Sequence, residues 1–221
     1  MTLDPTYRRI LHRMGYYSYQ QGLIISHLAQ EGGWNSHLRN CRDFIMKSVK
    51  FFNPDIVTIF GSGWLLDIPL KEMLEMNCRV NLVDIIHPPQ VARQVAGLGK
   101  VTLIEDDVSG GLILNIWKLA SGSFFRTKKP ITSAEIPLYK PRFETGLAVS
   151  ANILTQIESL PVEFIRKKLK ANDEEIIDFR KRVQEKHIEF YISRDLRQDL
   201  QFRQTSLPRS SHFLLSLSEK S

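Results

Sequence analysis

The sequence predicts an α/β protein in which helices cover both faces of a mostly parallel central sheet, giving three layers. Between residues 56 and 120, short apolar runs rich in β-branched residues alternate with segments of helical periodicity. The chain has 221 residues, 43% of them hydrophobic, which is enough to bury one substantial core. Strands that alternate with helices form right-handed crossovers, and these place the strands parallel with both faces of the sheet covered.

The first 55 residues are predicted to form helices that pack on this core. Two segments with apolar residues at helical spacing precede Gly32-Gly33, which interrupts the pattern. Asn35 or Ser36 is expected to cap a third helix, which ends at Asn53-Pro54. The apolar positions of the three helices are Ile10, Leu11, Met14 and Tyr17, then Leu23, Ile24, His27 and Leu28, and then Leu38, Cys41, Ile45, Val49 and Phe52.

The central stretch, 56–160, is predicted to hold the sheet. Strands are expected at Ile56–Phe60, Arg79–Val83 and Val101–Ile104, because each is short, apolar and bounded by breaking residues. A helix over 67–76, capped by Asp67, is expected to join the first two strands. Another, beginning at Pro88-Pro89 and reaching Leu98, joins the second to the third.

Groups suited to a nucleoside follow each of these three strands. Gly61-Ser62-Gly63 follows the first strand, and missing side chains there let the backbone approach a ligand. Asp84 ends the second strand, where a carboxylate can accept hydrogen bonds from a ribose diol. Asp106 and Asp107 follow the third strand, where an acid can meet the amino group of an adenine. Ligands of parallel sheets bind at the carboxyl ends of the strands, so we expect these groups to surround one site.

This arrangement resembles the class I methyltransferases that use S-adenosylmethionine, which have a Rossmann-like fold. The resemblance covers about residues 35–160 and implies that S-adenosylmethionine is the cofactor. It implies cofactor contacts at Gly61, Ser62, Gly63, Asp84 and at Asp107 or Asp106. It also implies a fourth strand near residues 148–152, with Asn152 at its tip facing the methyl group as the catalytic candidate.

The chain departs from the family pattern around the first loop. Phe60 stands where an acid is usual, and Trp64-Leu65 follows the second glycine where a further glycine is common. A dinucleotide fingerprint fits less well, because its third glycine would fall at Leu66. The site is therefore expected to bind the methyl donor, to bind another nucleotide, or to be a degenerate nucleotide site.

Residues 121–143 form a basic, proline-punctuated insertion whose Lys, Arg and aromatic side chains suit an anionic or aromatic acceptor. Helices are predicted at Pro161–Leu169 and Asp173–Tyr191 within a C-terminal extension over 161–221, and His212–Leu217 is a late strand candidate. A complete methyltransferase sheet generally has seven strands. About 30 residues follow the predicted long helix, which is too few for the remaining strands. We therefore expect the C-terminal side of the sheet to be truncated, replaced, or supplied by a partner chain.

The net charge of +6 leaves nucleic-acid binding possible, but the chain has no block of five or six like charges, so such binding is not indicated. No stretch approaches 18 uninterrupted apolar residues, so no membrane span is expected. Cys41 and Cys78 suggest reduced thiols in a cytoplasmic protein, and His37 with Cys41 is too small a set for a metal. Two functions remain open, a methyltransferase acting on an unidentified acceptor and a non-catalytic relative serving as a nucleotide-binding or interaction module.

Overall fold

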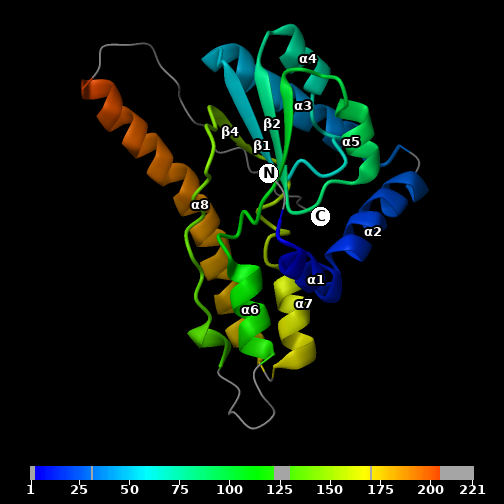
Figure 1. Ribbon diagram of the computed structural model, residues 1–221, viewed down its shortest axis with the longest axis vertical. Coiled ribbons are helices and arrows are strands. Elements are labelled where there is room, and N and C mark those ends of the chain that lie inside the picture. The colour runs from blue at the N-terminus through cyan, green and yellow to red at the C-terminus, as the bar shows by residue number, and fades with distance from the viewer. Residues whose placement is uncertain (1–2, 31, 122–129, 170, 205–221) are drawn as a thin grey trace.

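The computed structural model describes residues 3–30, 32–121, 130–169 and 171–204, and for 194–204 it describes the helical backbone alone. A sheet of four strands forms the middle of the fold (Figure 1). Its strands are β1 (Ile56–Phe60), β2 (Arg79–Asp84), β3 (Val101–Glu105) and β4 (Leu147–Ser150). All neighbouring strands pair in parallel, in the order β3-β2-β1-β4, which is a Rossmann-like topology. The predicted parallel α/β fold is confirmed.

The strand order creates a switch point between β1 and β4. The chain moves outward from β1 through β2 to β3, and then returns to the other side of β1. The register aligns the carboxyl ends, because Phe60 pairs with both Val83 and Ser150. Connections on the two sides of a switch point leave in opposite directions, and a crevice opens between them. A ligand site is therefore expected beyond Phe60.

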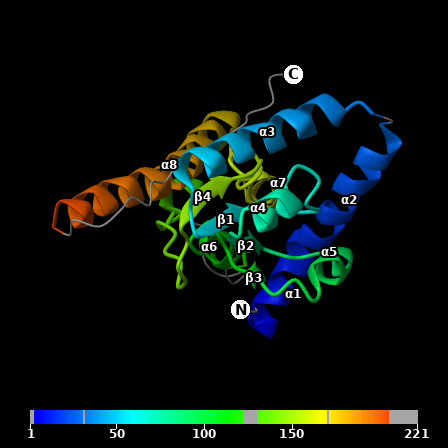
Figure 2. The ribbon, with the colours of Figure 1, turned by 90° about the horizontal axis from the view of Figure 1, so that it is seen from above.

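Helices cover both faces of the sheet (Figures 1 and 2). On one face, α3 (Asn35–Phe52), α4 (Leu70–Glu75) and α5 (Pro89–Val95) pack on alternate strand residues such as Ile59 and Leu82. The intervening residues, including Phe60 and Val83, face a second cluster built with four other helices. These helices are α1 (Pro5–Met14), α6 (Leu112–Ala120), α7 (Ser159–Lys168) and α8 (Asp173–Gln204).

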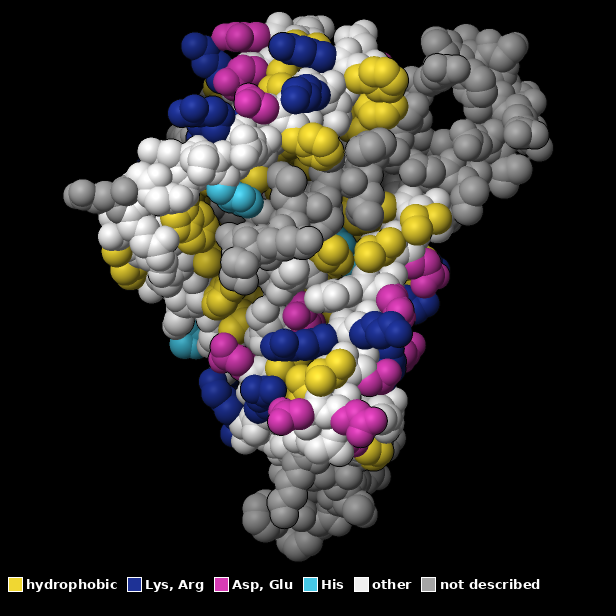
Figure 3. All heavy atoms as spheres, turned by 180° about the vertical axis from the view of Figure 1, so that it is seen from behind, with side chains coloured by type: hydrophobic (Ala, Val, Ile, Leu, Met, Phe, Trp, Pro, Cys, Tyr) yellow, Lys and Arg dark blue, Asp and Glu magenta, His cyan; other side chains and the backbone are white. Residues whose placement is uncertain are grey.

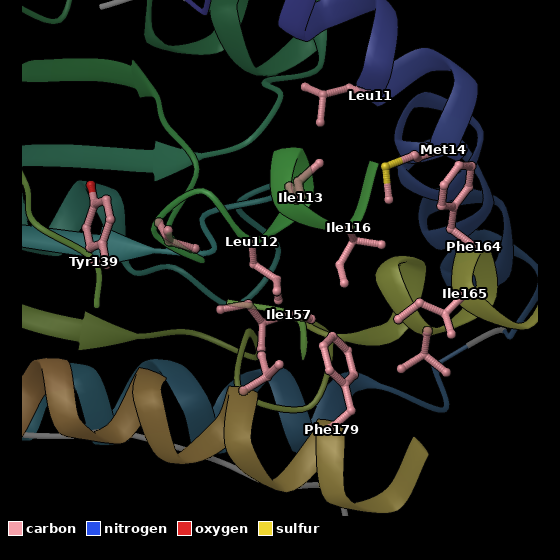
Figure 4. Packing of buried hydrophobic residues seen from close by; sticks show 14 of the residues in the cluster. Leu11, Met14, Leu112, Ile113, Ile116, Tyr139, Ile157, Phe164, Ile165 and Phe179 are labelled. Atoms are coloured by element: carbon pink, nitrogen blue, oxygen red, sulfur yellow. The ribbon is translucent and has the colours of Figure 1, made fainter. Parts of the chain in front are cut away.

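The second cluster is a close-packed helical core at the carboxyl end of the sheet. Leu11 and Met14 of α1 belong to the same cluster as Ile116 of α6, Ile165 of α7 and Phe179 of α8 (Figure 4). Because α1 contributes to the same core as α6, α7 and α8, the first and last helices of the described residues are held in one unit. Of the predicted N-terminal helices, α1 and α3 contribute residues to the core clusters.

The remaining helix, α2 (Tyr16–Ala29), is different, because none of its residues is buried. It connects α1 to α3, which pack in different core clusters, and so passes the carboxyl ends of the strands (Figure 1). Its apolar residues surround the helix instead of forming one stripe, and Leu28 is 70% exposed.

Several predicted boundaries were wrong. Asp67 does not cap α4, which begins after Pro69, and neither Asn35 nor Ser36 caps α3, whose N-cap is Trp34 without a side-chain hydrogen bond. α5 ends at Val95, before Leu98, and α8 continues past Tyr191 to Gln204. The strand candidate at 212–217 lies outside the described residues. Within the described part of the chain, no helix is long and apolar enough to span a bilayer.

Candidate functional site

A cavity of about 380 Å³ lies at the carboxyl ends of the strands. The loops after all four strands contribute to its wall, and α2 and the start of α3 complete it. Pockets of this size commonly hold small molecules. Most of the predicted site residues share its wall, namely Gly61, Ser62, Gly63, Asp84, Asp107 and Asn152, whereas Asp106 does not.

The glycine loop after β1 has an unusual backbone. Gly61, Gly63 and Leu65 all have left-handed φ values, of 80°, 47° and 60°. A Cβ on Gly61 would lie 2.5 Å from the backbone oxygen of Ala151, so this glycine lets the β1 and β4 loops touch. Around Gly63 the nearest heavy atom would be 4.0 Å away. Close packing against the β4 loop explains why residue 61 is a glycine. At Gly63 no neighbour is that close, and the backbone is open toward the cavity.

Asp84 links the end of β2 to the glycine loop. Its Oδ2 accepts from the backbone N–H of Gly63 at 2.7 Å, and its Oδ1 accepts from the N–H of Ile85 at 2.7 Å. The side-chain amide of Gln20 also donates to Oδ1, at 3.5 Å. Burial raises the pKa of Asp84, although these backbone bonds and nearby His87 oppose the shift. The backbone of Ile86 also contributes a hydrogen bond, so of the four donors around Asp84 the distant Gln20 amide is the one that a ligand in the cavity can replace.

Asp107 is saturated by the protein itself. Its Oδ1 accepts from the N–H and hydroxyl of Ser109, and its Oδ2 accepts from Tyr7 at 2.5 Å and from the N–H of Gly111 at 3.1 Å. These four donors fill the acceptor sites of one carboxylate. Burial raises its pKa, which the bonds from Ser109 and Tyr7 oppose. Asp107 therefore anchors α1 to the loop that precedes α6.

Asp106 points away from the cavity. Its Oδ2 accepts from the hydroxyl of Tyr139 at 2.7 Å, and its Oδ1 accepts from the N–H of Asp107 at 2.9 Å. Tyr139 is buried beside Phe60 in an aromatic cluster with α8, and burial raises its pKa. Of the insertion's predicted recognition residues, Tyr139 is thus a core residue, while Lys140 and Arg142 are exposed and do not line the cavity. Phe124, Phe125, Arg126, Lys128 and Lys129 lie outside the described residues.

Two polar atoms in the cavity residues have no hydrogen-bond partner. The hydroxyl of Ser62, a residue only 1% exposed, has none, and neither has Oε1 of Gln20. An unsatisfied buried polar group costs about 1–3 kcal/mol, and a bound ligand or water can remove that cost. These two atoms mark positions at which a ligand would gain hydrogen bonds.

Asn152 lies two residues beyond β4 and adopts a left-handed φ of 53°. Its side-chain amide donates to Oδ2 of Asp67 at 2.5 Å. Asp67 is buried, and burial raises its pKa, opposed partly by the nearby His37 and Arg42. Asp67, Asn152 and His37 thus form a polar group on the β4 side of the cavity, whereas Asp84 lies on the β2 side.

α2 forms the outer wall of the cavity through Tyr16, Tyr19, Gln20 and Leu23. Trp64, in the glycine loop, donates from its indole Nε1 to the backbone oxygen of Gln20 at 2.8 Å. The indole therefore lines the cavity and holds α2 against it. The Gln20 amide adds the second, longer link to Asp84.

The cavity is acidic. Asp67, Asp84 and Asp107 line it, and among the described residues no Lys or Arg does. Elsewhere the surface carries both signs, and Figure 3 shows acidic and basic side chains interspersed at the top and in the lower half of the view. Phosphate sites usually combine backbone N–H groups with cationic side chains, so this wall favours a neutral or cationic ligand.

Sequence reasoning missed the contribution of the N-terminal helices to the site. Tyr7, Tyr16 and Gln20 lie 64 to 100 positions from the aspartates they bond or approach, and no local pattern reports such contacts. Asp67 was assigned to a helix cap instead of the cavity wall. The predicted spacing of His37 and Cys41 brings Nε2 and Sγ to 3.5 Å, and within the described residues no group of three or more ligands could hold a metal ion.

Comparison of the chain with protein-family models, curated proteins and solved structures yields no match. The assignment of the site therefore rests on its geometry.

Proposed function

We propose that the chain binds S-adenosylmethionine in this cavity and transfers its methyl group to an acceptor. The observation that carries the proposal is an acidic cavity without Lys or Arg, placed at the β1/β4 switch point of a Rossmann-like sheet. S-adenosylmethionine carries a sulfonium, an ammonium and a carboxylate group, which leave a net positive charge, and it has no phosphate. Nucleotides with two or three phosphates would bring negative charge to three buried aspartates, which is unfavourable.

The residues of the cavity fit the parts of this molecule. At Asp84 a ribose hydroxyl would replace the long bond from Gln20 and keep the bonds from the backbone. Ser62 has a buried hydroxyl in need of a partner. Asp107 is filled by four protein donors, so we assign it to positioning the β3 loop instead of to the adenine. Leu65 has the left-handed backbone that a further glycine of the family pattern would adopt without strain.

The bound cofactor would supply an electrophilic methyl group. The protein's part would be to hold an acceptor in line with that methyl and to exclude water, which is a matter of positioning and desolvation. In the family resemblance the end of β4 faces the methyl group, and Asn152 stands there in a fixed, left-handed conformation. Its amide is committed to Asp67, so we assign Asn152 to orienting that carboxylate.

A second candidate is a non-catalytic binding module. Phe60, at the position of the family's acid, is fully buried against Tyr139, Phe190 and Tyr191 and offers no polar group. A site that has lost this acid can retain the ligand and lack turnover. Binding of the cofactor without methyl transfer to a panel of small acceptors would favour this candidate.

Calorimetric titration with S-adenosylmethionine and S-adenosylhomocysteine tests the proposal. We expect both to bind, Asp84→Asn to weaken binding about tenfold or more, and Ser62→Ala to weaken it less. Asp106→Asn is the matched control, because Asp106 follows a neighbouring strand yet lies outside the cavity. No binding heat and no thermal shift with either ligand would overturn the proposal.

A further inference from the structure

The β4 side of the cavity is chemically distinct from the β2 side. Asp84 ends β2 and Asn152 follows β4, and β1 lies between these strands. Two strand spacings separate the two groups by roughly 10 Å. If Asp84 holds the nucleoside, the polar group of Asp67, Asn152 and His37 lies toward the end at which an acceptor would enter.

Asp67 is the charged group of this second side. Its carboxylate is buried, lines the cavity, and has one oxygen fixed by the amide of Asn152. His37 lies nearby and lines the cavity, with its Nε2 3.5 Å from the sulfur of Cys41. Arg42 is also near, yet it does not line the cavity, and its guanidinium donates to the backbone oxygen of Leu66. An acceptor would therefore meet a carboxylate with no Lys or Arg in the wall, although His37 and Arg42 lie close enough to act on the charge of Asp67.

Aromatic and apolar side chains line the same cavity as this carboxylate. Tyr19 and Leu23 come from α2, Trp34 and Leu38 from the start of α3, and Trp64 from the glycine loop. Aromatic faces attract cations within about 6 Å of the ring centroid, and apolar side chains favour a ligand with a hydrophobic body. The unpartnered Oε1 of Gln20 adds a hydrogen-bond acceptor to the cavity residues.

We propose that this part of the cavity, defined by Asp67, Asn152, His37, Tyr19 and Trp34, is an acceptor subsite for a primary or secondary amine carried on an aromatic or apolar body. The inference rests on the proposed function, since it names the acceptor of the same site. A carboxylate or phosphate acceptor would face Asp67 without a Lys or Arg in the wall to compensate its charge. An amine gains a charge-assisted hydrogen bond there.

Asp67 also has a chemical part in this scheme. A protonated amine has no lone pair, so it first gives one proton to the Asp67 carboxylate. The neutral nitrogen then attacks the methyl carbon, the carbon–sulfur bond breaks, and the bonding pair remains on sulfur as a neutral thioether. The methylated amine leaves with the positive charge, and the proton on Asp67 passes to solvent, which restores the carboxylate. Asp67 thus touches the reacting nitrogen, whereas Asn152 positions Asp67.

The test uses the full chain saturated with S-adenosylhomocysteine and two matched probes, 2-phenylethylamine and 3-phenylpropionate. We expect the amine to bind at least tenfold more tightly than the acid. Asp67→Asn should abolish this preference, measured at saturating S-adenosylhomocysteine for each variant, and Asp67→Glu should restore part of it. Trp34→Leu should weaken the amine several-fold without favouring the acid, and it provides a second variant if Asp67→Asn does not fold. Asp55→Asn, at an exposed aspartate outside the cavity, is the control.

Measuring turnover distinguishes a catalytic base at Asp67 from a carboxylate with only a structural role. With S-adenosylmethionine and the amine, the wild-type kcat/KM should rise with pH, and Asp67→Asn should lower kcat more than it changes KM. The inference is overturned if the acid binds as well as the amine, if neither probe binds the loaded protein, or if Asp67→Asn leaves binding and the pH profile unchanged. Failure of the wild type to bind S-adenosylhomocysteine would instead remove the proposed function, and the inference with it.

Discussion

The backbone N–H of Gly63 donates to the carboxylate of Asp84 over 2.7 Å, which joins the loop after β1 to the end of β2. The same loop touches β4 through Gly61, since nothing larger than hydrogen fits beside the oxygen of Ala151. The glycine loop is therefore held from both of its neighbouring strands. Its shape depends on the Asp84 carboxylate on the β2 side and on the missing side chain of Gly61 on the β4 side.

Substituting the two glycines separates these effects. Gly61→Ala should lower the free energy of unfolding by about 2–4 kcal/mol, because a methyl group meets fixed backbone and the φ is left-handed. Gly63→Ala has only the φ penalty and should cost about 1–2 kcal/mol. Urea denaturation measures both. Equal losses would contradict the assignment of Gly61 to loop packing.

Ligand binding should depend on the protonation of Asp84. Burial raises the pKa of this carboxyl in the free protein, and a ligand that donates hydrogen bonds to the carboxylate lowers it again. Binding therefore releases protons, and the affinity for S-adenosylhomocysteine should fall as the pH is lowered through the raised pKa. Titrations in buffers of different ionisation enthalpy measure the released protons. Asp84→Asn should bind weakly and with a flat pH profile; an unchanged profile would exclude Asp84 as the titrating group.

His187 predicts a pH dependence of stability in the acid range. Its Nε2 lies 3.0 Å from the hydroxyl of Ser150, and burial lowers the pKa of the imidazole to about 4 from 6.5. The pKa of His187 is lower in the folded state than in the unfolded state. The contribution of the neutral imidazole to the stability of the protein is therefore fully present above pH 6.5 and is lost as the pH falls toward 4. The loss attributable to His187 is roughly 3 kcal/mol.

The measurement is the free energy of unfolding of wild type and His187→Gln at several pH values. The difference between the two should shrink as the pH falls across this window. The buried aspartates have raised pKa values and act in the opposite direction, and they cancel in the comparison. His12→Gln, at an exposed histidine of α1, is the control and should leave the profile unchanged. A constant difference between wild type and His187→Gln would contradict the buried, neutral imidazole.

Phe179 and Ile177 of α8 offer a matched pair for the helical core. Phe179 is 0% exposed in the core of Figure 4, whereas Ile177 is 66% exposed two residues earlier. Phe179→Ala should cost about 3–5 kcal/mol through lost burial and the cavity left behind. Ile177→Ala should change stability by less than about 0.5 kcal/mol. Thermal or urea unfolding checks both values, and a small effect at Phe179 would show that α8 does not complete the core.

The sheet was predictable from sequence because its first three strands are short segments rich in branched apolar residues that begin shortly after Pro54, Asn77 and Gly99. The strands were expected within one residue of β1, β2 and β3. The glycine loop, Asp84 and Asn152 were expected to share a site for the same reason, since topology alone brings strand ends together. These inferences needed only local pattern and the general rule for parallel sheets.

The rest of the site depends on contacts that no local pattern contains. Asp107 was expected to bind a ligand, yet Tyr7, 100 positions earlier, occupies one of its acceptor sites. α2 gave an apolar signal without a buried stripe, because it covers a cavity instead of a core. Asp67 has the sequence context of a helix cap. Its hydrogen bond with Asn152, 85 positions later in the chain, is a contact that no local pattern indicates.

The position of α1, which is fixed in part by the bond between Tyr7 and Asp107, also constrains when the fold can be completed during synthesis. The first helix emerges from the ribosome long before its partners, because α6 and α7, which it contacts, end at Ala120 and Lys168. Until those helices exist, Leu11 and Met14 have no core to enter. The N-terminal segment therefore cannot complete its packing until α7 has been synthesised, and the same holds for the cavity, whose wall includes Ser159 and Leu160. Such long-range closure slows folding, so the cavity is expected to be the last part of the molecule to reach its final form.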